Sequence, residues 1–152
     1  MEKSEIIDSL NNDLRVELSA VEIYTAHSEA IQEDEIVQGV KAILEVERGH
    51  AEELTQRIEE LGGLPAKSGE KDTRMGKALG ASSKQGSTLE MLRFELSEEQ
   101  QAIKDYSVEI ADIIYDTTTI AMLRKHLMDE IDHADWLKSK IVELEGKEKG
   151  RP

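Results

Sequence analysis

The chain has 152 residues, no cysteine and a formal net charge of −14. This length suits one domain with a substantial core, and the absence of cysteine excludes disulfides, cysteine catalysis and thiolate metal sites of the rubredoxin type. So negative a charge argues against nucleic acid as a partner. Because no apolar run has the length of a signal peptide or a membrane span, we expect a cytoplasmic protein without membrane association.

Long stretches rich in Glu, Leu, Ile, Ala and Lys, with Pro65 and Pro152 as the two prolines, favour an all-α fold. Apolar residues recur in alternating steps of three and four, the spacing of helices that pack in a bundle. The pattern predicts four long helices, over residues 4–32, 33–61, 87–115 and 116–145. Ser4 and Asp116 are the expected N-caps of the first and last helix, and Gly62-Gly63 ends the second.

The connections between these helices predict the topology. The connection near residues 32–33 is short, so the first two helices should be antiparallel neighbours. Residues 64–87 form a long stretch of low hydrophobicity that can carry the chain back along the bundle, and residues 75–79 could form a short helical turn on the way. We therefore expect an antiparallel four-helix bundle with one long crossover, occupying residues 1–145 as one domain. Residues 146–152 should be a polar flexible tail.

One four-residue pattern, a glutamate followed three residues later by a histidine, occurs twice in the chain. The two copies are Glu47-Arg48-Gly49-His50 and Glu130-Ile131-Asp132-His133. On a helix this spacing leaves both side chains on one face, about one turn apart. The other two predicted helices each carry a glutamate, Glu17 and Glu95, at a position that the pattern reserves for apolar residues. Two Glu-x-x-His helices and two single-Glu helices form the ligand set of a dinuclear iron or manganese site in a four-helix bundle.

Four carboxylates that converge inside a bundle cannot all stay ionised without cations, because mutual repulsion and desolvation raise their pKa values. One explanation is that they are unrelated polar groups, neutralised by protons or by Lys and Arg. The apolar stripes contain almost no Lys or Arg to serve this purpose. Two divalent ions would balance the four carboxylates, and two neutral imidazoles would complete the ligand set. Such ligands suit iron or manganese, with zinc as a possible occupant.

Several neighbouring residues have roles that the pattern leaves open. Tyr24 lies two turns beyond the first glutamate on the same stripe, where it could donate to a ligand carboxylate, pass an electron or simply pack in the core. His126 is expected to be a satisfied core histidine, with support of a ligand as the alternative. Glu99 lies on the same stripe as Glu95 and is a candidate extra ligand, whereas we expect Glu98 to face solvent.

The motifs extend over nearly the whole chain to about residue 145. They comprise Glu17-Leu18-Ser19-Ala20 followed by Tyr24 and His27, Glu47-Arg48-Gly49-His50-Ala51, Leu61-Gly62-Gly63-Leu64-Pro65, Leu89-Glu90-Met91-Leu92 through Glu95, and Glu130-Ile131-Asp132-His133-Ala134-Asp135-Trp136-Leu137. These segments resemble the ferritin-like superfamily of di-iron carboxylate proteins, and bacterioferritins most of all; rubrerythrins share the Glu-to-Tyr and Glu-x-x-His spacings. The resemblance implies a ferroxidase centre made by the six matching residues, in which His50 and His133 are terminal ligands and Glu47 and Glu130 bridge two iron ions.

The chain departs from bacterioferritins at two points. Arg48 occupies the position of their haem-ligating methionine, so no haem is expected. The last residues are too few and too polar for their fifth helix, so we expect a homodimer or larger homo-oligomer rather than the closed 24-subunit cage.

The expected function is oxidation of Fe(II) by O₂ or H₂O₂, in iron homeostasis or detoxification. Two alternatives remain. One is a rubrerythrin-like peroxidase, which would be favoured if Glu98 or Glu99 acts as a movable extra ligand. The other is a non-catalytic assembly protein that uses metal to hold its bundle together.

Overall fold

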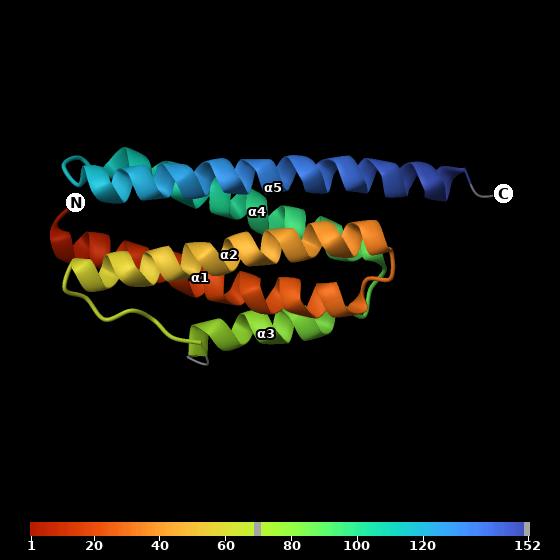
Figure 1. The fold of residues 1–152 in the computed structure, drawn as a ribbon, viewed down its shortest axis with the longest axis horizontal. Coiled ribbons are helices and arrows are strands. Elements are labelled where there is room, and N and C mark those ends of the chain that lie inside the picture. Colours follow the sequence, from red (N-terminus) through yellow and green to blue (C-terminus); the bar gives the residue numbers. More distant parts are fainter. Residues whose placement is uncertain (69–70, 151–152) are drawn as a thin grey trace.

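The computed structural model describes residues 1–68 and 71–150, with the backbone alone for residues 71–76. It contains the helices α1 (Lys3–Ala30), α2 (Asp34–Glu60), α3 (Lys71–Ser83), α4 (Thr88–Asp112) and α5 (Thr117–Lys149), and no strand within these ranges. The long helices α1, α2, α4 and α5 form a bundle in which α1 and α2 are antiparallel, α4 and α5 are antiparallel, and α4 is parallel to α2 (Figure 1). The predicted all-α bundle with one long crossover is therefore confirmed.

The crossover contains a helix where the sequence predicts at most a short turn over residues 75–79. Helix α3 spans 13 residues and lies along α1 on the outside of the bundle (Figure 1). The two helices approach closely at Gly80, where an added Cβ would lie 3.1 Å from the carbonyl oxygen of Glu22 and 3.2 Å from the Cβ of Ala26. The segment has few apolar residues, so its helical character depends on this contact with α1 rather than on an apolar stripe of its own.

Local interactions at the helix ends agree with most of the predicted boundaries. Asp116 is the N-cap of α5, as predicted, and Ser87 is the N-cap of α4; each side chain accepts from the backbone N–H three residues later. The predicted cap at Ser4 is wrong, because α1 begins earlier and is capped by Glu2. Gly62, with φ of +87°, follows the end of α2 in a conformation that other residues rarely adopt.

The C-terminal segment differs from the predicted flexible tail. Helix α5 continues past residue 145 to Lys149. Lys147, Glu148 and Lys149 are good helix formers, and the lysines lie in the last turn, where positive charge is favourable. Gly146 does not interrupt the helix, because a glycine within an established helix costs only about 1 kcal/mol. Residues 151–152 lie outside the described ranges.

The apolar core has two parts, one toward each end of the bundle. One contains Leu10, Leu14, Leu54, Ile58 and Leu123, and the other contains Tyr24, Val40, Leu92, Leu137 and Ile141. Between these two parts, every long helix contributes buried carboxylates or imidazoles to a polar layer, so the bundle is apolar at both ends and charged in the middle.

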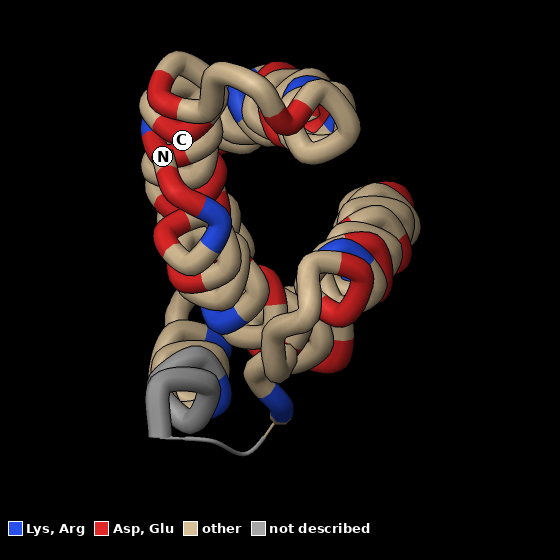
Figure 2. The backbone as a smooth tube through the Cα atoms, turned by 90° about the vertical axis from the view of Figure 1, so that its left-hand side faces the viewer, with Lys and Arg blue, Asp and Glu red and all other residues tan. Residues whose placement is uncertain are grey.

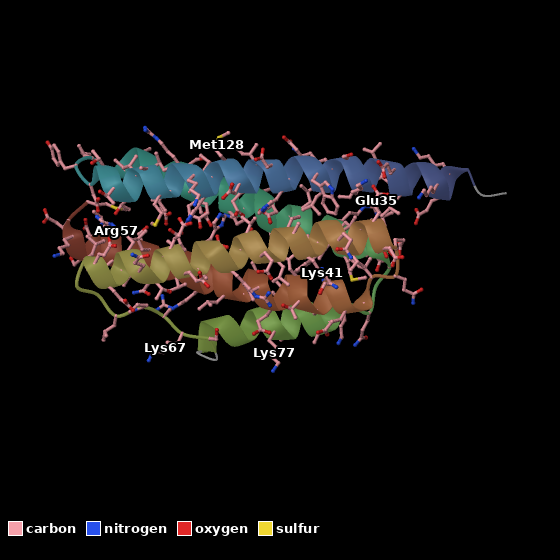
Figure 3. All side chains as sticks on the ribbon, viewed as in Figure 1. Glu35, Lys41, Arg57, Lys67, Lys77 and Met128 are labelled. Atoms are coloured by element: carbon pink, nitrogen blue, oxygen red, sulfur yellow. The ribbon has the colours of Figure 1, made fainter. Side chains whose placement is uncertain are left out.

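The antiparallel pair α1–α2 is joined to the antiparallel pair α4–α5 near the C-terminal end of α2, where Arg57 lies (Figure 3). Arg57 of α2 donates from Nη2 to Asp116 Oδ1 at 2.8 Å and from Nε to Thr119 Oγ1 at 2.9 Å. This interaction connects the end of the first hairpin to the N-cap of α5 and thus helps to align α2 with α5. None of the described helices is long and apolar enough to cross a membrane.

Candidate metal centre

The polar layer contains two groups of side chains with the arrangement of metal ligands. In each group the potential ligand atoms all lie within 4.8 Å of one another. The groups are Glu17, Glu47, His50 and Glu130, and Glu47, Glu99, Glu130 and His133. They share Glu47 and Glu130, so these two carboxylates lie between two adjacent positions for ions. All six residues are buried, and they come from all four long helices of the bundle.

Five of the six predicted ligands are brought together, and Glu95 is not among them. The Oε1 atom of Glu95 lies 3.0 Å from Nδ1 of His27, whose Nε2 contacts Ser83 Oγ at the end of α3 at 2.6 Å. Glu99, one helical turn further along α4, takes the predicted place of Glu95 in the centre. Both glutamates lie on the buried stripe, so the axial position of α4 against its neighbours decides which of them reaches the other ligands. We therefore revise the ligand set to include Glu99.

Glu17 and Glu99 each belong to only one of the two ligand groups, and each accepts a hydrogen bond from a tyrosine. Tyr24 Oη donates to Glu99 Oε1 at 2.6 Å, and Tyr106 Oη donates to Glu17 Oε1 at 2.6 Å. Each tyrosine follows a glutamate of its own helix by seven residues, and each donates to the glutamate of the other helix. A hydrogen bond from Tyr24 to a carboxylate, one of the alternatives that the sequence leaves open, is thus present. The role of Tyr106 was missed, although the repeated Glu-x₆-Tyr spacing on α1 and α4 was a usable signal.

Both imidazoles of the centre present Nδ1 to the carboxylates. Nδ1 of His50 lies 3.1 Å from Glu130 Oε1, and Nδ1 of His133 lies 3.0 Å from Glu47 Oε1. On the other side of the ring, Nε2 of His50 lies 2.8 Å from Asp129 Oδ2. This carboxylate favours the tautomer that carries its proton on Nε2, which leaves the Nδ1 lone pair free for a metal.

His126 is buried beside the centre but belongs to neither group. Its ring stacks on His50 with a centroid separation of 4.0 Å, and its Nε2 lies 3.1 Å from Glu53 Oε2. The expected core position of His126 is confirmed, but the histidine is not fully satisfied, because its Nδ1 is buried without a hydrogen-bond partner. Its stacking on His50 fits the alternative, support of a candidate ligand. Glu98 is half-buried on α4 rather than fully exposed to solvent as predicted, and desolvation raises its pKa.

In the absence of metal, protons must balance the charges of this centre. Burial, together with the charge of Glu17, raises the pKa of Glu47 and of Glu130 well above the ordinary value. Burial opposes ionisation of His50, but the carboxylates of Glu130 and Glu17 outweigh it and raise the His50 pKa to about 11. Burial also opposes ionisation of Glu17, yet its close contacts with Glu47 and His50 lower its pKa to about 2. The metal-free centre therefore holds protons that bound cations would displace.

Buried side-chain atoms that lack a hydrogen-bond partner show whether metal ions fit the site. Each of the six residues has a buried side-chain atom without a hydrogen-bond partner, although two histidine–glutamate pairs among these atoms lie within ion-pair distance. These atoms are Glu17 Oε2, Glu47 Oε1, His50 Nδ1, Glu99 Oε2, Glu130 Oε1 and His133 Nδ1. Buried polar atoms normally have partners, and leaving one unpaired costs about 1–3 kcal/mol. Six such atoms from the two groups are explained together if each faces a bound cation, so the residues present fit a dinuclear metal centre.

Comparison with known proteins agrees with this architecture. A family described as the ferritin-like domain matches residues 7–146. The chain belongs to the ferritin-like family. No curated protein matches the sequence.

Among solved structures, similar folds include a protein from Bacteroides fragilis described as a dodecameric thioferritin and bacterioferritin-related protein. It is 20% identical over 98% of this chain and 91% of that chain, with a TM-score of 0.82. The bacterioferritin BfrA of Mycobacterium tuberculosis is 24% identical over 96% of this chain and 89% of its own, with a TM-score of 0.80. A further BfrA structure is 25% identical over 97% and 88% of the two chains, with a TM-score of 0.75.

Proposed function

We propose that this ferritin-like chain binds two iron ions and oxidises Fe(II) with O₂ or H₂O₂, as a ferroxidase in iron homeostasis or detoxification. The observation that carries the proposal is the pair of ligand groups that share Glu47 and Glu130. In this arrangement Glu17 and His50 would hold one ion, Glu99 and His133 would hold the other, and Glu47 and Glu130 would serve as ligands to both.

Bound iron supplies the redox chemistry: electrons from Fe(II) reduce O₂ to peroxide or H₂O₂ to water. The residues of the chain hold the charges and control the geometry. Tyr24 and Tyr106 restrict the orientation of Glu99 and Glu17, because each donates to one carboxylate oxygen. The two apolar parts of the core exclude water from the ends of the polar layer, which strengthens the interaction of carboxylates with cations.

Anaerobic titration of the metal-free protein with Fe(II) tests the binding step. Two ions per chain are expected, together with release of protons from Glu47, Glu130 and His50, because their pKa values are raised in the metal-free centre. Binding of a single ion, or binding without proton release at neutral pH, would contradict the proposed centre.

Rapid mixing of the Fe(II)-loaded protein with O₂ and, separately, with H₂O₂ tests the chemistry. Fast oxidation by O₂ supports a ferroxidase, whereas fast oxidation by H₂O₂ alone indicates the rubrerythrin-like peroxidase. Slow reaction with both oxidants, combined with a large rise in thermal stability on metal binding, indicates the non-catalytic assembly role. The ferroxidase is preferred because Glu99 is held by Tyr24 and Glu95 by His27, which favours a fixed ligand set over a movable one.

We propose in addition that the chain forms homo-oligomers and does not bind haem. The related Bacteroides fragilis protein is described as a dodecamer. Arg48 lies on the surface of α2, where it pairs with Glu45. Light scattering combined with an absorbance scan tests both statements: a monomer would refute the first, and a Soret band from bound haem would refute the second.

A further inference from the structure

Three polar side chains from three helices form a chain of contacts where α3 ends. His27 lies in the last turn of α1 and is fully buried. Its Nε2 atom lies 2.6 Å from Oγ of Ser83, the last residue of α3, and its Nδ1 atom lies 3.0 Å from Oε1 of the fully buried Glu95 on α4. A hydroxyl, an imidazole and a carboxylate in this order have the connectivity of a nucleophile, its base and the group that orients the base.

The carboxylate decides where the protons of this chain lie. Burial raises the pKa of Glu95 to about 6, while the hydrogen bond with His27 opposes the rise, so the carboxyl group is mostly ionised at neutral pH. An ionised carboxylate can only accept, so Nδ1 of His27 carries the proton and Nε2 presents its lone pair. The Ser83 hydroxyl therefore donates to Nε2, which is nearer than its other acceptor, the Gly80 carbonyl oxygen at 3.4 Å.

Packing holds the imidazole in place and leaves the hydroxyl as the outermost group of the three. Phe94 meets the His27 ring edge-on, with ring centroids 6.1 Å apart, which limits rotation of the imidazole. The close approach of α3 to α1 at Gly80 lies one turn before Ser83 and brings the hydroxyl within reach of His27. Ser83 is only partly buried, on a helix that lies outside the bundle (Figure 1), so it is the member of the chain that a molecule from solvent can meet.

We propose that Ser83, His27 and Glu95 form a nucleophilic triad that hydrolyses neutral, activated esters. In the first step Ser83 Oγ bonds to the carbonyl carbon of the ester while its proton moves to Nε2 of His27. The bond from that carbon to the leaving oxygen then breaks, and the alcohol or phenol leaves with the proton. Water next attacks the acyl group, and the proton that it gives to His27 returns to Ser83 as the carboxylic acid leaves. Glu95 stabilises the imidazolium in both steps.

The surroundings of Ser83 limit the class of ester. The backbone N–H groups of residues 84–86 donate to carbonyl oxygens at the end of α3, so they do not form a donor pair for an oxyanion. Esters with a good leaving group, such as a phenol, depend least on such donors, and amides depend on them most. The formal net charge is −14 and acidic side chains are numerous around the bundle (Figure 2), which disfavours anionic esters. The expected substrates are therefore phenyl esters of short, neutral acids.

The nucleophile can be tested with a neutral fluorophosphonate, a reagent that labels activated serines. Ser83 Oγ would bond to phosphorus as fluoride leaves, and mass spectrometry of peptides locates the adduct. We expect wild-type protein to be labelled on Ser83 and S83A to take up no label. The matched control S82A, which changes the exposed neighbouring serine, should be labelled at the wild-type rate. The full chain is used with a chelator present, so the result does not depend on whether the dinuclear centre binds metal.

Variants of the other two members separate a triad from hydrogen bonds that only tie α3 to the bundle. H27Q removes the base and should slow labelling of Ser83 by about 100-fold or more. E95Q should slow it as well, because an amide can donate to Nδ1 and favour the tautomer whose Nε2 carries the proton and cannot accept from Ser83. Absence of label on wild-type Ser83, or equal labelling rates in wild type and both variants, would overturn the triad. If H27Q fails to fold, E95Q alone provides the comparison.

Hydrolysis is followed by the release of p-nitrophenol from p-nitrophenyl acetate, again in the presence of a chelator. Wild type and S82A should release p-nitrophenol faster than S83A, H27Q and E95Q, and the acetyl group should be found on Ser83 after rapid quenching. Release by S83A at the wild-type rate would overturn the ester hydrolysis, because the background reaction of other side chains would then account for all of it.

Discussion

Because Glu99 rather than Glu95 lies among the candidate ligands, glutamine substitutions at these two positions should affect metal binding differently. Glu99→Gln removes a carboxylate from the group that contains His133, so binding of one metal ion should weaken. Loss of a supporting partner alone typically costs about 10–100-fold in metal affinity, and loss of a direct ligand should cost at least as much. Glu95→Gln leaves both groups intact, and two ions should still bind.

The same substitution at Glu95 should change the stability of the metal-free protein. Burial raises the pKa of Glu95 to about 6 from an ordinary value of 4.5, although the hydrogen bond with His27 lowers it. A carboxyl group whose pKa is raised on folding binds its proton more tightly in the folded state, so the protein loses stability as the pH rises from about 4.5 to 6. This difference corresponds to about 2 kcal/mol. Glutamine cannot ionise, so metal-free Glu95→Gln should be about 2 kcal/mol more stable than wild type at pH 7 and similar to it below pH 4.5.

Two measurements check these expectations. Equilibrium titration with Mn²⁺ gives the number of bound ions and the affinities of both variants, and urea unfolding in the presence of a chelator gives the free energy of unfolding from pH 4 to 8. If Glu95→Gln loses a metal ion while Glu99→Gln retains both, Glu95 is the ligand and the position of α4 in the bundle differs from the one described. A pH-independent stability difference would show that Glu95 does not titrate as its burial implies.

Three further predictions concern the centre and the packing around it. Glu130→Ala should abolish rapid Fe(II) oxidation in stopped-flow assays, while the metal-free variant should be as stable as wild type or more so, because a buried repelling carboxylate is removed; oxidation at the wild-type rate would refute this role. Gly39→Ala should lower the free energy of unfolding by about 1–3 kcal/mol, because its Cβ would lie 1.9 Å from Cζ2 of Trp136. The control Gly146→Ala should be neutral or stabilising, because a Cβ at that position would meet nothing within 4 Å. Arg57→Ala should cost about 1–3 kcal/mol in urea unfolding, because it removes hydrogen bonds to the N-cap region of α5; an unchanged midpoint would show that this connection between the hairpins does not contribute.

Much of the site could be predicted from the sequence because helical periodicity is a local property. The Glu-x-x-His spacing determines that Glu47 and His50, or Glu130 and His133, share one face of a helix wherever that helix packs. The apolar stripes on either side of these residues determine that this face is buried. Glu17 could be predicted in the same way, since a glutamate on an apolar stripe implies a partner for its charge.

The remaining features depended on contacts between distant segments. Glu95 and Glu99 are equivalent by local criteria, since both lie on the buried face of α4. Helix α3 forms beside α1 although its own apolar pattern is weak.

The sequence by itself therefore determined the four long helices, their buried faces and the chemistry of the candidate ligands, because these follow from backbone periodicity and side-chain type. Only the tertiary structure decided which glutamate of α4 lies among the candidate ligands. A shift of α4 by one helical turn, about 6 Å for four residues, would change the partner of every side chain on its buried face. The same face would still be buried, so the apolar pattern does not distinguish the two positions. In this structure Tyr24 meets Glu99 and His27 meets Glu95, and these contacts define the position of α4 in the bundle.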